Sequence, residues 1–310
     1  MPLLSVENLR TSYASRGHTL HAVDGVSFEI GANETVGLVG ESGCGKSTLG
    51  KTIVRLLRPS EGVIRLDGED ISQLGERSLR PVRRTVQMVF QDPFGSLNPR
   101  QRVGTILDTP LKVHGVNDAK ARRRRILEII GKISLPETAL QRYPHEFSGG
   151  QRQRIGIARA LVLQPKLVVC DEPVSALDLS IQAQILNLLV DLKKDFGLAY
   201  LFISHDLSVV RYFADRVLVM YLGRIVESAD HTTLWRNPRH PYTRALLASI
   251  PSAKPARKPA AVLAGEAGQG IPARGCRFRT RCPVAVTQCE TDDPALRKLE
   301  DGSAVACHLA

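Results

Sequence analysis

The stretch FSGGQ at residues 147–151 lies between two other stretches that are typical of a nucleotide site. Upstream, residues 40–48 read GESGCGKST, and downstream, residues 167–172 read LVVCDE. The upstream stretch fits the pattern G-x-x-x-x-G-K-[ST], a glycine-rich loop that binds nucleotide phosphates. The order of the three stretches along one chain is more informative than any of them alone.

The upstream stretch has the strand–loop–helix context that a phosphate-binding loop needs. The apolar run 35–39 predicts a short buried strand, and residues 47–54 predict the start of a helix. The glycines let backbone N–H groups converge on phosphate oxygens, and the helix N-terminus adds partial positive charge. Lys46 is expected to reach the β- and γ-phosphates of ATP, and Ser47 to ligate Mg²⁺. The predicted ATP-binding residues of this loop are Gly40, Ser42, Gly43, Cys44, Gly45, Lys46, Ser47 and Thr48.

The downstream stretch predicts a buried strand that ends in two carboxylates. Asp171 lies where the chain leaves this strand, and a carboxylate there can hold Mg²⁺ directly or through water. Glu172 is one residue further on, so its side chain is expected to point the other way. A second carboxylate beside the γ-phosphate can polarise an attacking water, which predicts Glu172 as the catalytic base.

With FSGGQ between these two motifs, the chain resembles ABC ATPases and no other class of phosphate-loop protein. In that family the middle motif closes over the ATP bound by a partner chain, so the resemblance implies a dimer. It implies that Ser148, Gly150 and Gln151 meet the γ-phosphate of the partner's ATP, with the following helix pointing its N-terminus at that phosphate. The segment 175–178, SALD, resembles the D-loop that lies across such a dimer interface.

The same resemblance implies roles for three further residues. Tyr13 stands where ABC ATPases stack an aromatic ring on adenine, although it could instead be a core aromatic. Gln91 resembles the glutamine that senses the γ-phosphate and the lytic water, and it is also a predicted Mg²⁺ ligand. His205 resembles the switch histidine at the γ-phosphate, with a hydrogen-bonded strand-end histidine as the alternative. The resemblance therefore implies Gln91, Glu172 and His205 as the catalytic group.

Several longer stretches resemble one subgroup, the ATPase subunits of bacterial dipeptide and oligopeptide ABC importers. They are residues 90–100, 143–154, 237–243 and 281–283, and Phe147 replaces the leucine usual in the signature. Within the subgroup, the chain looks more like the second of the two ATPase subunits. The implied partners are a sister ATPase, two membrane permeases and an extracytoplasmic peptide-binding protein. A nickel or glutathione importer of the same subgroup remains an alternative.

The chain of 310 residues has a net charge of +11, which raises the question of nucleic-acid binding. The densest basic run, Arg122–Arg125, is predicted to be a solvated helix face, and no nucleic-acid partner is expected. A single cassette, with about 120 residues between Lys46 and Asp171, argues against the ABC proteins of ribosomes and DNA repair. No apolar run approaches the ~20 residues of a membrane span, and no signal peptide is recognised. The expected location is the cytoplasmic side of the inner membrane, with attachment through the permeases.

The expected fold is α/β: a phosphate-loop NTPase of ABC type with an antiparallel β subdomain and an inserted α-helical subdomain. Alternating residues at 3–9 and 21–30 predict the antiparallel strands. Residues 1–250 are assigned to the ATPase domain, with the helical subdomain at about 93–163, and residues 251–310 to a linker (251–261) and a cysteine-rich extension. Further strands are predicted at 63–68, 166–170, 199–204 and 216–220. Further helices are predicted at 119–132, 181–196 and 207–213.

Four of the six cysteines lie in the last 35 residues, with the spacing C-x5-C-x6-C-x17-C. A cytosolic chain is not expected to hold stable disulfides, so clustered thiols suggest a metal centre. Zinc sites usually use tight C-x2–4-C pairs, which are missing here, so the spacing favours a [4Fe–4S] cluster. Zinc and four unligated thiols are the alternatives, and His308 could replace a ligand. The predicted cluster ligands are Cys276, Cys282, Cys289 and Cys307.

Overall fold

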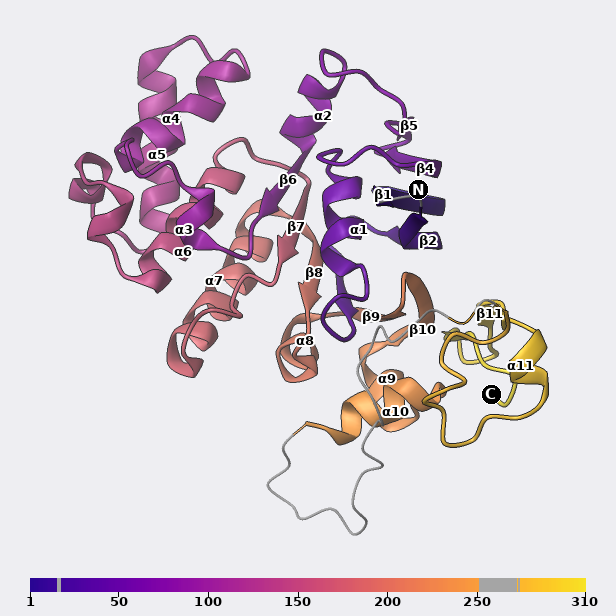
Figure 1. Cartoon of the computed structure of the whole chain (residues 1–310). Coiled ribbons are helices and arrows are strands. Elements are labelled where there is room, and N and C mark those ends of the chain that lie inside the picture. The colour runs from indigo at the N-terminus through magenta and orange to yellow at the C-terminus, as the bar shows by residue number, and fades with distance from the viewer. Residues whose placement is uncertain (16–17, 251–271, 273) are drawn as a thin grey trace.

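The computed structural model describes residues 1–15, 18–250, 272 and 274–310 (Figure 1). The predicted linker at 251–261 lies outside the described residues. Two sheets organise the described chain, one of four strands and one of eight. Among the described residues, every helix is too short or too polar to span a lipid bilayer.

The larger sheet has the strand order β11-β12-β10-β9-β3-β8-β7-β6. Its five strands from β9 to β6 run parallel, whereas β10, β12 and β11 pair antiparallel at the other edge. Its strands are β3 (Thr35–Val39), β6 (Val86–Val89), β7 (Leu167–Asp171), β8 (Ala199–Ser204), β9 (Arg216–Tyr221), β10 (Arg224–Asp230), β11 (Arg297–Lys298) and β12 (Ala304–Val305).

The larger sheet separates two hydrophobic cores because successive side chains of a strand point to opposite faces. On β8, Tyr200 and Phe202 belong to one core, whereas Leu201 and Ile203 belong to the other. The first core also holds the helical subdomain, α7 (Leu179–Phe196) and α8 (Leu207–Phe213); the second holds α1 (Lys46–Ile53) and the smaller sheet. The phosphate loop after β3 and the carboxylates at the end of β7 therefore lie at the ends of strands that are packed on both faces.

The smaller sheet has the order β2-β1-β4-β5, with all pairs antiparallel, as predicted. Its strands are β1 (Leu4–Ser15), β2 (His18–Ile30), β4 (Glu61–Leu66) and β5 (Glu69–Asp70). Both β1 and β2 are longer than predicted. Register shifts interrupt the pairing of β1 with β2 between Val6 and Ser12. Each register shift breaks the alternation of apolar and polar residues from which β1 was predicted, so its predicted range ended too early. Tyr13 consequently lies on β1.

Helices fill the segment between β6 and β7, as predicted. They are α3 (Pro93–Ser96), α4 (Val103–Val113), α5 (Ala119–Lys132), α6 (Gly149–Leu161) and the 3-10 helices η1 (Glu137–Gln141) and η2 (Pro144–Glu146). Helix α2 (Leu79–Thr85) precedes β6. The bounds of α5 are those predicted.

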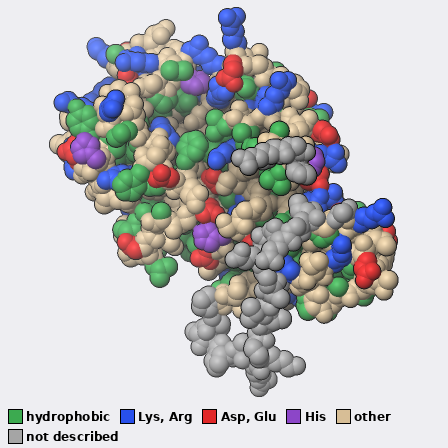
Figure 2. Space-filling view, in the orientation of Figure 1, with side chains coloured by type: hydrophobic (Ala, Val, Ile, Leu, Met, Phe, Trp, Pro, Cys, Tyr) green, Lys and Arg blue, Asp and Glu red, His purple; other side chains and the backbone are tan. Residues whose placement is uncertain are grey.

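The interpretation of Arg122–Arg125 as a solvated face is wrong for two of its four residues. Arg122 donates to Asp108 Oδ1 at 2.7 Å, and Arg125 donates to the carbonyls of Leu161 and Val162 at 3.1 and 3.2 Å. Both side chains are largely buried, because an arginine stem can pack while its head binds carbonyls. Elsewhere, Figure 2 shows basic side chains interspersed with acidic ones on the face in view.

The chain beyond residue 273 joins the larger sheet, a pairing that the sequence did not predict. Strand β12 pairs with β10 through Glu227–Val305 and Ser228–Ala304, and β11 pairs with β12. Helices α9 (His231–Arg236) and α10 (Pro241–Ala248) precede this part, and α11 (Gln288–Thr291) lies within it. We call residues 274–310 the C-terminal module; in Figure 1 it lies beside β10 and α10. The assignment of domains at residue 250 stays a prediction.

Candidate nucleotide site

The phosphate-binding loop connects β3 to α1, and its glycines are required by close backbone neighbours. Gly40 has φ of 156°, and a Cβ there would lie 2.2 Å from the carbonyl oxygen of Met220. Gly45 has φ of 108°, and its Cβ would lie 2.1 Å from the carbonyl oxygen of Ala22. Any other residue at these two positions would collide with β9 or β2, so the glycines fix the path of the loop.

The charged groups of the loop are held by short contacts. Lys46 is 5% exposed, and its Nζ donates to the carbonyl oxygens of Gly40 at 2.8 Å and Glu41 at 3.0 Å. Ser47 Oγ donates to Asp171 Oδ1 at 2.7 Å, which joins the loop to the end of β7. A hydroxyl and a carboxylate at one point are the hard oxygen donors that Mg²⁺ prefers, so these residues fit the ion. Burial raises the pKa of Asp171 above its ordinary value, and the bond from Ser47 opposes that rise.

The three residues assigned to catalysis come together beside this pair. Gln91 Nε2 donates to Glu172 Oε2 at 3.0 Å, and His205 Nδ1 lies 3.1 Å from the same oxygen. They follow β6, β7 and β8, whose carboxyl ends meet at one edge of the sheet. Glu172 has φ of 46°, and its N–H donates to the carbonyl of Ile203, which holds the residue at the edge of β8. Within the described chain, Oε1 of Glu172 accepts no hydrogen bond.

Tyr13 lies beside the first turn of α1. Its hydroxyl is 3.4 Å from Thr48 Oγ1, and the residue is 41% exposed. This exposure argues against the alternative of a core aromatic. Its predicted contact with adenine stays a prediction.

The signature residues stand apart from the phosphate loop of their own chain. Ser148 caps α6: its Oγ accepts from the Gln151 N–H at 3.3 Å, and its own N–H donates to Gln151 Oε1 at 3.1 Å. Figure 1 places α6 among the other helices of its subdomain, whereas α1 lies beside β2. Gly150 packs closely on α7, because a Cβ there would lie 2.5 Å from Ile181 Cγ2. The D-loop residue Asp178 caps α7 by accepting from the Ile181 N–H at 2.9 Å.

The four C-terminal cysteines line one small cavity between the C-terminal module and the start of α10, together with His240 and His308. Burial raises the pKa of Cys276 to about 11 and also raises that of Cys282. The cavity is ≈ 10 Å³, room for about one water. Within the described residues, no three His, Cys, Asp or Glu side chains are arranged to hold a metal ion. The donor chemistry suits a metal centre, but the space between the thiols does not fit a cluster as it stands.

The sequence missed three contacts around Glu41 of the phosphate loop. Its carboxylate accepts a two-point ion pair from Arg281, and its N–H donates to the hydroxyl of Tyr242 at 2.8 Å. Partners more than 200 residues away leave no local pattern that could predict them. The third contact is the bond from Lys46 to the Glu41 carbonyl.

Comparison with known proteins identifies the family of the chain. Residues 23–175 match the family model described as ABC transporter, and residues 226–289 match that of the oligopeptide/dipeptide transporter C-terminal region. A putative peptide import ATP-binding protein of Brucella ovis is 52% identical over 308 residues, covering 99% of this chain and 97% of the relative. The oligopeptide transport ATP-binding protein AppF of Bacillus subtilis is 52% identical, covering 93% and 89%. The di/tripeptide transport ATP-binding protein DppF of Pseudomonas aeruginosa is 48% identical, covering 95% and 92%.

A solved structure, the ATP-binding cassette MJ0796 as a dimer bound to ADP and Pi, is also similar. Its TM-score is 0.68 with 29% identity, and the match covers 74% of this chain and 98% of MJ0796. The chain belongs to the ABC transporter family, among the ATP-binding proteins of oligopeptide and dipeptide transporters. The ABC-type fold, the family and the transport-coupled ATPase expected from the sequence are confirmed.

Proposed function

We propose that this chain is the ATP-hydrolysing subunit that powers import of dipeptides or oligopeptides in a multi-subunit ABC transporter. The observation that carries the proposal is the Gln91–Glu172–His205 group, which lies beside the Ser47–Asp171 pair and the phosphate loop. The peptide as cargo rests on the names of the relatives, whose matches span nearly the whole chain.

Each residue of the site has a part in hydrolysis. Lys46 exchanges its bonds to loop carbonyls for phosphate oxygens and neutralises their charge. Ser47, Asp171 and Gln91 would hold Mg²⁺, and the ion would offset phosphate charge. Glu172 takes the proton of the attacking water on Oε1, while Gln91 and His205 hold Oε2 in place. Tyr13 supplies a face for adenine.

The second half of each ATP site comes from another cassette. Ser148, Gly150 and Gln151 offer the N-terminus of α6 to the partner's γ-phosphate, a favourable position for an anion. Leu179, which follows the D-loop, is 82% exposed, and an apolar side chain at that position suits contact with a second subunit. We assign the partner to a non-identical sister ATPase. Two permeases anchor the pair at the cytoplasmic face of the membrane, and a peptide-binding protein outside delivers the cargo.

The C-terminal module is the cysteine-rich extension of the ATPase domain, and its four cysteines would hold a metal centre, with [4Fe–4S] favoured over zinc. Their shared cavity and the softness of thiolate ligands support this assignment. The cavity must open on metal uptake, since it holds about one water as it stands. Iron and acid-labile sulfide measured on an anaerobic preparation test the assignment, with Cys289→Ser as the matched variant. Zinc without iron selects the alternative metal, and absence of both leaves four unligated thiols.

Reconstitution in lipid vesicles with the permeases and the sister ATPase tests the transport function. Uptake of a radiolabelled dipeptide is expected to require ATP and to stop with Glu172→Gln. ATP-driven uptake of nickel or glutathione without peptide uptake would reassign the cargo. Co-purification of the chain with ribosomes or DNA, and without permeases, would overturn the transport function itself.

A further inference from the structure

The C-terminal module reaches back to the phosphate loop through one two-point ion pair. Arg281 Nη1 donates to Glu41 Oε2 at 2.7 Å, and Nη2 donates to Oε1 at 2.8 Å. The Arg281 side chain is only 9% exposed. A paired guanidinium and carboxylate of this kind fix geometry as well as charge, and burial reduces screening by water.

A buried aromatic cluster supports the same contact from behind. Tyr242, which accepts the Glu41 N–H, has its ring centroid 4.7 Å from that of Tyr221 and 5.5 Å from that of Phe278. Phe278 belongs to the C-terminal module and is three residues before Arg281. Tyr242 and Phe278 are fully buried, so the module and α10 form one packed unit behind the loop.

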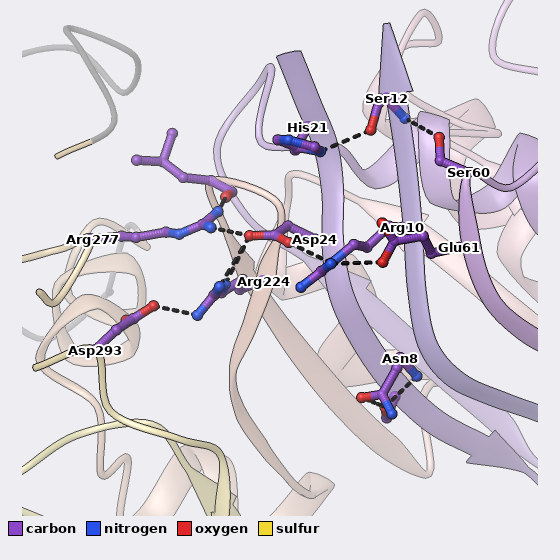
Figure 3. A network of polar contacts seen from close by, with 12 residues as sticks. Asn8, Arg10, Ser12, His21, Asp24, Ser60, Glu61, Arg224, Arg277 and Asp293 are labelled. Carbon is purple, nitrogen blue, oxygen red and sulfur yellow. Dashed lines mark hydrogen bonds and ion pairs between the residues drawn. The ribbon is translucent and has the colours of Figure 1, made fainter. Parts of the chain in front are cut away.

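A second anchor ties the module to Asp24 of β2 (Figure 3). Asp24 accepts ion pairs from Arg277 of the module and from Arg224 of β10, and Arg224 also pairs with Asp293 of the module. Asp24 lies two residues after Ala22, whose carbonyl oxygen sets the path of Gly45. The module thus holds strand β2 as well as the loop.

Glu41 is held at three points of one residue: its carboxylate by Arg281, its N–H by Tyr242 and its carbonyl by Lys46. The Lys46 contact must be released when phosphate binds, whereas the other two can persist. The contacts of Arg281 and Tyr242 with Glu41 can therefore hold the backbone of the loop in place while Lys46 changes partners. A loop that is already ordered loses less conformational entropy when nucleotide binds.

We infer that Arg281 is a positioning residue for nucleotide binding, and that the C-terminal module preorganises the phosphate loop by clamping Glu41. The inference rests on the proposed function, because it assumes that ATP binds in this loop. Arg281 acts through Glu41 and not on ATP itself. Its loss is therefore expected to weaken nucleotide affinity without removing any group that contacts the nucleotide.

The test is binding of the non-hydrolysable analogue AMP-PNP with Mg²⁺ to the full-length chain, measured by calorimetry. Arg281→Ala is expected to raise the Kd about 3- to 10-fold, and Arg281→Lys is expected to restore part of the affinity. The double variant Glu41→Gln, Arg281→Ala is expected to bind no more weakly than the weaker single variant, because each change removes the same Arg281–Glu41 ion pair. The matched control is Arg239→Ala, which breaks the ion pair of Arg239 with Asp301 of the module, away from the loop. That control is expected to change the Kd less than 2-fold.

The outcomes separate the clamp from the proposed function. A wild-type chain that does not bind AMP-PNP overturns the proposed function. Wild-type binding with Arg281→Ala unchanged within 2-fold overturns the clamp alone. An equal loss in Arg239→Ala also overturns it, because the effect is then general loosening of the module. If Arg281→Ala does not fold, Glu41→Gln carries the same test, since that change lies outside the module.

Discussion

Gly150→Ala probes whether the N-terminus of α6 works across a dimer interface. Gly150 is the fourth residue of FSGGQ, and it packs against α7 with no room for a side chain. An added Cβ would lie 2.5 Å from Ile181 Cγ2, whereas carbon atoms in contact prefer about 3.5–4.0 Å. The start of α6 must therefore move away from α7 by about 1 Å, and Ser148 and Gln151 move with it.

The expected loss follows from that displacement. A misplacement of about 1 Å at a reacting centre can lower the rate by about 100-fold. We expect Gly150→Ala to reduce ATP turnover in the assembled transporter by between about 10- and 100-fold, equal to about 1.4–2.7 kcal/mol of activation free energy. AMP-PNP affinity of the isolated chain is expected to change less than 2-fold, because α6 does not form the phosphate loop of its own chain.

Phosphate release from the reconstituted transporter is the assay, with a matched control on the same helix. A Cβ at Gly156 would meet no atom within 4 Å beyond its chain neighbours and the backbone of its own helix, so Gly156→Ala is expected to keep full turnover. The added change Ile181→Ala removes the colliding methyl group and is expected to recover part of the activity of Gly150→Ala. Turnover of Gly150→Ala within 2-fold of wild type would refute the reasoning, as would equal damage from Gly156→Ala.

Three further predictions follow from the site and its surroundings. Glu172→Gln is expected to bind ATP normally and to lower turnover by about 10²- to 10⁴-fold, because the base is lost; near-normal phosphate release would remove Glu172 from that role. Lys46→Ala is expected to abolish detectable AMP-PNP binding in calorimetry, and unchanged affinity would contradict its role. Burial lowers the pKa of His240 from 6.5 to about 4, so the unfolded chain takes up a proton first as pH falls, and stability is lost between these values. From pH 7 to pH 5 the free energy of unfolding is expected to fall by about 2 kcal/mol. Urea unfolding measures this loss, which is expected to be largely absent in His240→Asn. An equal loss in the variant would show that another group is responsible.

Much of the larger sheet could be predicted because its signals are local. Strands β3 and β8 and helix α5 have the predicted bounds, and β7 is displaced from its prediction by one residue. Each is a short apolar run or a helical pattern bounded by polar residues, and burial on both faces explains the continuous runs. The grouping of Gln91, Glu172 and His205 was implied only by resemblance, and the parallel order of β6, β7 and β8 supplies its physical reason.

The parts that could not be predicted depend on distant partners. The bulged pairing of β1 hides its length, and two-residue strands such as β12 carry too little pattern to be recognised. Arg122 and Arg125 resemble a solvated basic run until their carbonyl and carboxylate partners are known. The cysteine spacing suggested a metal centre, but spacing alone does not determine how far apart the thiols lie.

The conformation of the phosphate loop depends on residues outside its sequence motif. The motif supplies glycines and a lysine, but the shape of the loop is set by carbonyls of Met220 and Ala22 and by the grip on Glu41. Those partners belong to β9, β2, α10 and the C-terminal module, so segments outside the nucleotide motifs decide how well the loop is prepared for phosphate. Because Arg281 and Cys282 are adjacent, the residue that clamps the loop and a thiol of the cysteine cavity share one peptide bond. The ion pair that clamps Glu41 and the cysteine cavity are therefore immediate neighbours along the chain.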